Sequence, residues 1–112
     1  MDINLLGELI VASAAQTSPG FWMPAGGNDG VGGVEVFLND TANAFNVLVQ
    51  TKSSDEIDSA ATTIGTVTIS STSPTTYKFD LANARDLVRY VVSATKAGKI
   101  HLQLAQPLWH PN

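Results

Sequence analysis

The chain has 112 residues, of which 44% are hydrophobic and 14% charged, and its formal net charge is −4. This length fits one domain, because two separate cores would each be too small to fold well alone. Only six Lys and Arg residues are present and they do not cluster, which argues against nucleic acid as a partner. The absence of cysteine excludes a disulfide framework, a thiolate metal site and a cysteine nucleophile.

The N-terminal segment from Ile3 to Ala15 is apolar, but Asp2 stands where a signal peptide has basic residues and Glu8 interrupts the run. The run is also too short to span a membrane. We therefore expect mature structure in a protein made in the cytoplasm without export, and no membrane partner. Its pattern predicts a strand over Leu5–Ser13, with a short amphipathic helix as the competing interpretation.

The next third of the chain alternates between polar or glycine-rich connections and strands. Ala14–Pro19 reads as a polar connection, and Phe21–Met23 reads as a short edge strand because prolines bound it. Residues 26–33 contain five glycines and match no phosphate-binding motif, so we expect a flexible loop there. Val34–Leu38 and Phe45–Thr51 alternate apolar and polar residues, which predicts two strands.

The remainder continues the same theme. Lys52–Thr62 is a polar excursion with a helical turn, and Ile64–Ser70 and Tyr77–Leu81 predict strands. Leu87–Ala94 and Ile100–Gln106, joined by a glycine-bearing turn, read as a β-hairpin. In the last strand we expect the apolar positions to face the core and the polar positions to face outwards.

About eight short strands at regular spacing predict an all-β protein. The expected architecture is a single antiparallel β-sandwich, jelly-roll-like, over residues 1–112, with a flexible glycine-rich loop at 26–33.

No catalytic constellation is visible, so we expect no enzyme activity and no catalytic, cofactor-binding or metal-binding residues. The acidic run Asp55–Asp58 lacks the spacing of a calcium loop and reads better as a solvated loop face. His101 and His110 have no third ligand in evident reach, so we expect surface or interface positions for both.

The aromatic segments near prolines are candidates for contact with a partner. Their tryptophans either plug an end of the sandwich or are offered to a partner, because aromatic rings contribute strongly in both settings. Arg89 either pairs with an acid such as Asp86 or Asp80, or anchors an interface. The candidate partner-binding residues are Phe21, Trp22, Met23, Arg89, Trp109 and His110.

Three segments resemble small β-sandwich virion proteins of tailed bacteriophages. They are Asn46-Val47-Leu48-Val49-Gln50-Thr51-Lys52 with its following acidic loop, Phe79-Asp80-Leu81, and Asp86-Leu87-Val88-Arg89-Tyr90. The resemblance reaches to Trp109, covers about 60% of the chain, and is one of strand pattern.

This resemblance implies a non-enzymatic virion structural protein, most simply a capsid decoration (cement) protein on the capsid exterior. It implies homo-oligomers that clamp neighbouring subunits, with the major capsid protein or other virion subunits as partners. The low charge of the chain favours packing against other proteins as well, because few charges need desolvation. The alternatives are a carbohydrate- or receptor-binding β-sandwich module and a head or tail accessory protein.

Overall fold

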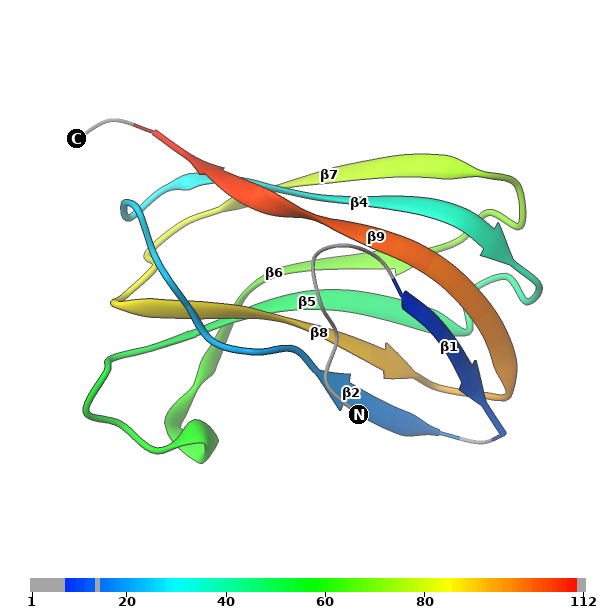
Figure 1. Ribbon diagram of the computed structural model, residues 1–112, viewed down its shortest axis with the longest axis horizontal. Helices are drawn as coiled ribbons and strands as arrows, with labels where there is room; N and C mark the ends of the chain where they lie inside the picture. The colour runs from blue at the N-terminus through cyan, green and yellow to red at the C-terminus, as the bar shows by residue number, and fades with distance from the viewer. Residues whose placement is uncertain (1–7, 14, 111–112) are drawn as a thin grey trace.

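The computed structural model describes residues 8–13 and 15–110 of the chain, and the regular secondary structure of this part is almost entirely β-strand (Figure 1). It contains nine strands and one short 3-10 helix, Asp58–Ala60, which matches the helical turn expected in that polar excursion. The strands are β1 (Glu8–Ala12), β2 (Gln16–Pro19), β3 (Met23–Pro24), β4 (Gly30–Asn39), β5 (Phe45–Lys52), β6 (Thr62–Ile69), β7 (Thr75–Leu81), β8 (Leu87–Ala94) and β9 (Gly98–Trp109).

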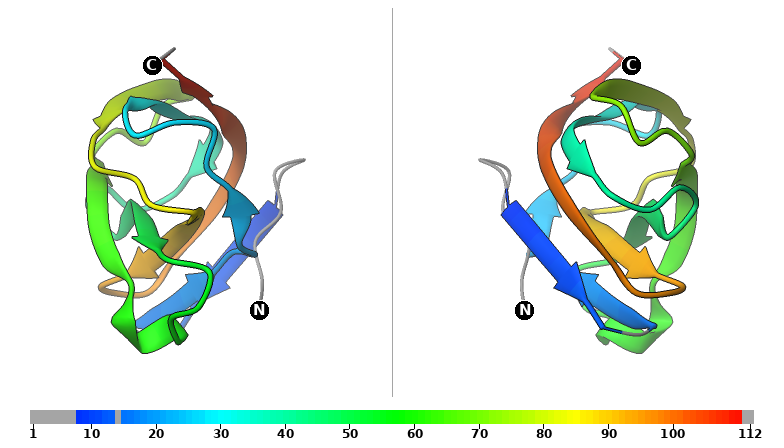
Figure 2. Two further views of the ribbon diagram at one scale, coloured as in Figure 1. Left: turned by 90° about the vertical axis from the view of Figure 1, so that its left-hand side faces the viewer. Right: turned by 90° about the vertical axis from the view of Figure 1, so that its right-hand side faces the viewer.

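The strands form two antiparallel sheets that pack face to face. One sheet has the order β1-β9-β4-β7, and the other has the order β2-β8-β5-β6 with the two-residue strand β3 added beside β8. Viewed along the strands, the two sheets curve towards each other and enclose the core (Figure 2). The predicted all-β sandwich is confirmed.

The pairing of the strands is nested. Apart from β3, the first strand pairs with the last, the second with the second to last, and so on inwards: β1 with β9, β2 with β8, β4 with β7 and β5 with β6. Two four-stranded sheets joined in this way form a jelly roll. The fold is therefore a jelly roll of eight main strands.

The terminal β-hairpin predicted from the sequence is wrong. β8 has the predicted bounds, but its last residue, Ala94, pairs with Phe45 of β5, whereas Gly98 of β9 pairs with Ala12 of β1. The turn between them carries the chain from one sheet to the other. Alternation fixes which face of a strand is apolar, and the apolar faces of β8 and β9 meet across the core instead of lying side by side.

Other boundaries also differ from expectation. The short edge strand expected over Phe21–Met23 is instead Met23–Pro24, and Phe21 and Trp22 precede it. Gln16–Pro19 forms the edge strand β2 instead of a connection, and it lacks an apolar pattern because the residue that it buries fully is Ser18. Gly30–Gly33 belong to β4 instead of a loop. A side chain at Gly32 would meet the ring of Phe79 at 3.0 Å, so close packing of the core explains that glycine. The expected start of the first strand at residues 5–7 lies outside the described residues.

The core lies between the two sheets and is built from inward-facing residues of both. In β9, Ile100, Leu102 and Leu104 are buried while His101 and Gln103 are exposed, as their alternation predicts. The hydrophobic stabilisation of the fold therefore depends on every second residue of each strand.

Tyr90 crosses the core from β8 to the opposite sheet. Its hydroxyl donates a hydrogen bond to the carbonyl oxygen of Ala105 (2.6 Å) and accepts one from the N–H of Gly33 (3.2 Å). The register of β4 and β9 shifts between Val31 and Gly33, so the hydroxyl satisfies backbone groups next to this irregularity. Burial raises the pKa of the Tyr90 phenol, because the core disfavours its charged form.

We predict that Leu102→Ala lowers the free energy of unfolding by about 2–5 kcal/mol, the usual range for truncating a buried leucine. Gln103→Ala, on the outer face of the same strand, should change it by under about 0.5 kcal/mol. Urea denaturation of dilute protein measures both values. Equal losses would contradict the assignment of the two faces.

We predict that Tyr90→Phe lowers the free energy of unfolding by about 1–3 kcal/mol, because two part-buried backbone groups lose a partner. Tyr77→Phe, whose hydroxyl accepts one bond from the N–H of Ser71, is the matched control and should lose less. The raised pKa of Tyr90 adds a pH signature, since the unfolded state loses the phenolic proton first as pH rises above about 10. Stability should therefore fall more steeply there in the wild type than in Tyr90→Phe, and equal slopes would refute the assignment.

Candidate partner-binding surface

The segment Phe21–Trp22 lies beside the β2-β8-β5-β6 sheet, and backbone pairing with β8 fixes the chain on both sides of it. β2 pairs with the Val91–Ala94 end of β8, and β3 pairs with Leu87 and Val88 at the other end. The N–H of Gly20 also donates to the carbonyl of Tyr90 (2.8 Å). Phe21 and Trp22 therefore span the gap between two short edge strands, and Phe21 is 47% exposed.

Two cations lie over the indole ring of Trp22. The guanidinium carbon of Arg89 is 4.5 Å from the ring centroid and the Nζ atom of Lys52 is 4.9 Å from it. The indole Nε1–H donates to Oδ1 of Asp58 (3.0 Å). The side chains of Lys52 and Arg89 are only 10% and 15% exposed, and a cation–π contact shielded from water contributes up to about 2 kcal/mol, so these interactions together fix the ring.

Asp58 and Gln50 hold the two cations in place. Asp58 Oδ1 accepts from Lys52 Nζ at 2.9 Å, and its Oδ2 lies 3.6 Å from Arg89 Nη1. The Nε–H of Arg89 donates to Oε1 of Gln50 (3.0 Å). The hydrogen bond from Lys52, followed by the one from Trp22, holds the pKa of the Asp58 carboxyl below its ordinary value. We call Trp22, Gln50, Lys52, Asp58 and Arg89 the Trp22 cluster.

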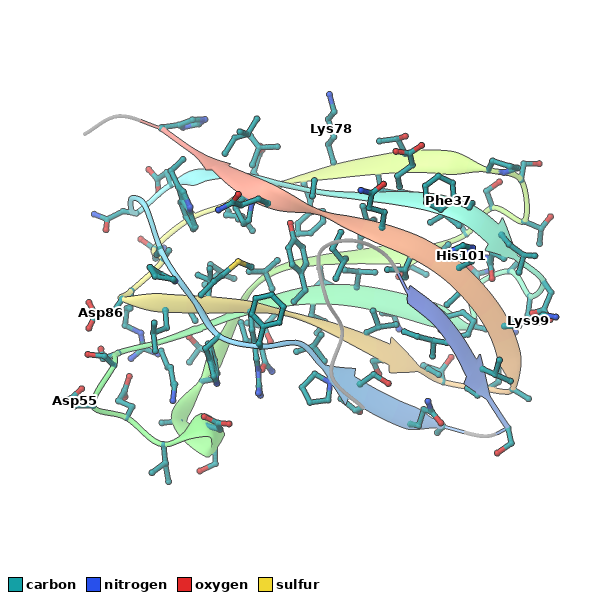
Figure 3. All side chains as sticks on the ribbon, in the orientation of Figure 1. Phe37, Asp55, Lys78, Asp86, Lys99 and His101 are labelled. Carbon is teal, nitrogen blue, oxygen red and sulfur yellow. The ribbon has the colours of Figure 1, made fainter. Side chains whose placement is uncertain are left out.

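The acidic run that contains Asp58 is more engaged than its sequence suggested. Glu56 forms an ion pair with Arg85 (2.6 Å), and its carboxylate accepts from the N–H of Ser53 (2.7 Å). That backbone hydrogen bond is the main reason why the pKa of Glu56 is lowered. The run is still exposed as expected at Asp55, at the tip of the loop (Figure 3), and at Asp58, whose side chain is 61% exposed, while Glu56 is half-buried.

The structure brings two of the predicted candidates together and separates the rest. Arg89 pairs with Asp58 instead of the expected Asp86 or Asp80, and it lies against Trp22. Met23 packs against the core from β3, which makes it a support for its neighbours instead of a free contact. Phe21 is exposed, and Trp22 is half-buried by its polar neighbours instead of by the core.

Trp109 and His110 lie at the end of β9 and are not part of the Trp22 cluster. The ring of Trp109 packs against the core and covers Gly26 and Gly30, where an added Cβ would approach it to 2.6 Å and 3.0 Å. The N–H of His110 donates to the carbonyl of Asp29 (2.9 Å), and its side chain is exposed. Of the two roles open to the tryptophans, Trp109 has the packing of a core plug and Trp22 lies on the outer side.

Sequence reasoning missed Gln50, Lys52 and Asp58 as partners of Trp22. Two connections separate these residues from it, so local pattern gives no sign of their proximity. It also missed Phe37, which is exposed beside His101. Here a signal existed, because Val34 and Val36 point inwards and their register places Phe37 outwards.

Neither the chemistry of the described residues nor comparison with known families identifies a function. In the described part of the chain no group of three His, Cys, Asp or Glu residues could hold a metal ion, and no helix is long and apolar enough to cross a membrane. No protein-family model matches the sequence, and no curated protein matches it significantly. Function must therefore be inferred from the fold and its surfaces.

We predict an acid transition in the fluorescence of Trp22. In a Trp109→Phe background Trp22 is the one remaining tryptophan. Because the folded-state pKa of Asp58 is lowered, the cluster is intact above the ordinary carboxyl pKa and is lost as pH falls through the folded value, below about pH 4. The emission maximum should shift to the red there, and Asp58→Asn should abolish the transition. A transition that survives Asp58→Asn would contradict this assignment.

Proposed function

We propose that this chain is a non-enzymatic structural protein of a tailed-phage virion, of the capsid decoration type, that binds the capsid exterior. Its partners are the major capsid protein or other virion subunits, and it forms homo-oligomers after synthesis in the host cytoplasm. The jelly-roll strand order supports this proposal, since viral capsid proteins use the same architecture, although lectins and cupins do so too.

The observation that carries the proposal is the fixed, outward position of Trp22 beside the exposed Phe21. Binding energy at protein interfaces concentrates in a few Trp, Tyr and Arg side chains. A tryptophan already held by Lys52, Arg89 and Asp58 loses little freedom when a partner covers it. We therefore assign Phe21 and Trp22 as the contact and the rest of the Trp22 cluster as its support.

The distribution of charge favours a protein partner. Both arginines, Arg85 and Arg89, are in ion pairs with acids of the 53–61 connection, and so is Lys52. These cations are therefore already paired, and a protein surface that covers this region meets few unpaired positive charges.

We predict that Trp22→Ala weakens binding to capsids by about 2 kcal/mol or more, roughly 30-fold in Kd, as loss of an anchor residue does. The assay is co-sedimentation with capsids assembled from the major capsid protein encoded in the same genome. Val11→Ser removes a 62% exposed apolar side chain from β1 and should leave binding unchanged.

Thermal melts of the same proteins separate binding from folding. Trp22→Ala should lower the melting temperature less than Trp109→Ala does, because the ring of Trp109 packs against the core and that of Trp22 does not. No binding of the wild type to capsids would reject the decoration role. Binding to tails alone would favour an accessory protein, and saturable quenching of tryptophan fluorescence by a saccharide would favour a carbohydrate-binding module.

A further inference from the structure

The outer face of the β1-β9-β4-β7 sheet carries an ordered ladder along β4 and β9. Gly33 with Ala105 and Glu35 with Gln103 are cross-strand pairs. Beyond them Phe37 stands at a register shift, and its ring contacts that of His101, whose partner in the register is Leu38. The ladder therefore runs from a pair that is almost without side chains, through a polar pair, to an aromatic pair.

The Gly33–Ala105 end of the ladder is a hollow in the surface. Two adjoining depressions, of about 250 Å³ and about 360 Å³, share Gly33, Lys78 and Ala105 in their lining. Gly30 and Gly32 are glycines because a Cβ would meet a neighbour at 2.5 Å and 3.0 Å, but at Gly33 the nearest atoms are 3.6 Å away. A side chain would fit at Gly33, so core packing does not require this glycine, and its absence of a side chain shapes the surface.

The opposite end of the ladder protrudes. Phe37 is 44% exposed, although it lies in the middle of a strand at an irregularity between Val36 and Leu38. Its ring is 5.4 Å from that of His101 at an interplanar angle of 57°, and the two side chains stand side by side in Figure 3. Leu38 beside it is exposed as well.

We propose that this face binds a second copy of the same chain, with the aromatic pair of each copy seated over the hollow of the other. Gly33 and Phe37 lie on the same side of β4, about 13 Å apart at the usual rise of a strand. In an isologous contact residue i meets j and j meets i, so one face must carry both complementary shapes. This ladder carries both, separated by the Glu35–Gln103 pair.

The charges of the face are also self-complementary. Glu35 supplies a carboxylate acceptor, Gln103 an amide donor, and Lys78 an ammonium group at the edge of the hollow, and all three side chains are exposed. In the two-fold arrangement the Glu35 residues of the two copies approach each other at the middle of the ladder, so the Gln103 amide and the Lys78 ammonium group of the opposite copy are the donors that offset their charges. Figure 3 shows Lys78 pointing away from the sheet on this side.

This inference rests on the proposed homo-oligomer and adds the face that forms it. The face belongs to the other sheet from the Trp22 cluster, so its test does not use capsids. Sedimentation velocity of the full chain over a range of concentrations should show a reversible dimer. Phe37→Ser, which removes the knob, and Gly33→Gln, which fills the hollow, should each weaken the dimer by roughly tenfold or more.

Ile57→Ser is the matched control, because Ile57 is 72% exposed on the 53–61 connection, away from this face. It should dimerise as the wild type does. Circular dichroism melts should show all three variants folded, since none of the three side chains lies in the core.

A mixture of the two interface variants gives the sharpest test. The Phe37→Ser chain keeps its hollow and the Gly33→Gln chain keeps its knob, so together they restore one of the two contacts. The mixture should form a heterodimer tighter than either variant's homodimer. A monomeric wild type, dimers indifferent to both substitutions, or a mixture no tighter than its components would overturn the proposal.

Two further outcomes would also overturn it. If the wild type is monomeric and Phe37→Ser loses capsid binding, this face binds a capsid subunit instead of a second copy. A saccharide that binds the hollow of a monomeric wild type would give it to a glycan. If Phe37→Ser no longer dimerises but still binds capsids through Trp22, both proposals are supported. If the wild type dimerises but does not bind capsids, only the decoration role is rejected.

Discussion

The hydroxyl of Tyr90 is the interaction on which the arrangement of the two sheets depends most. It leaves β8, crosses the core and bonds to Gly33 and Ala105 where the ladder between β4 and β9 shifts register. A buried phenol without partners would destabilise the fold, and so would unpaired backbone groups at the irregularity. One side chain removes both penalties and fixes how far apart the sheets stand at this point.

The residues around Tyr90 follow from its position. Phe79 packs against it edge to face, with ring centroids 6.4 Å apart, and a Cβ added at Gly32 or Gly65 would come within 3.0 Å of the Phe79 ring. The inward glycines of this region are therefore required by two aromatic rings. Gly33 points the other way and has no such constraint, so the same strand segment that closes the core also leaves the surface hollow.

The sequence predicted the faces of strands better than their partners. Ile100, Leu102 and Leu104 were assigned to the core correctly, because alternation is a local property. The hairpin of β8 and β9 was wrong, because a short turn with glycine serves equally well to cross from one sheet to the other. The glycine-rich run was read as a loop for a similar reason, since nothing local shows that an aromatic ring far along the chain occupies the space beside Gly32.

In the candidate site, too, individual residues could be predicted from the sequence but their long-range contacts could not. Trp22 was singled out from its residue type and flanking prolines and Arg89 as an arginine in an apolar strand, and the structure places Arg89 over the indole. The contribution of Lys52 and Asp58 could not be read from sequence, because the 53–61 connection has to fold back before they meet Trp22. Contacts between polar side chains that are far apart in the chain produce no periodic pattern in the sequence.

The two proposed contact surfaces lie on opposite outer faces of the sandwich. Arg89 and Trp22 lie on the outer side of the β2-β8-β5-β6 sheet, and the ladder from Gly33 to Phe37 lies on the outer side of the other sheet. The core lies between them, so a partner on one side does not compete with a partner on the other. A rigid two-sided module of this kind is suited to join neighbours on a particle, because each contact keeps its geometry when the other forms. The Tyr90 bond adds to that rigidity, since it links β8, which carries Arg89, directly to the strand pair that carries the ladder.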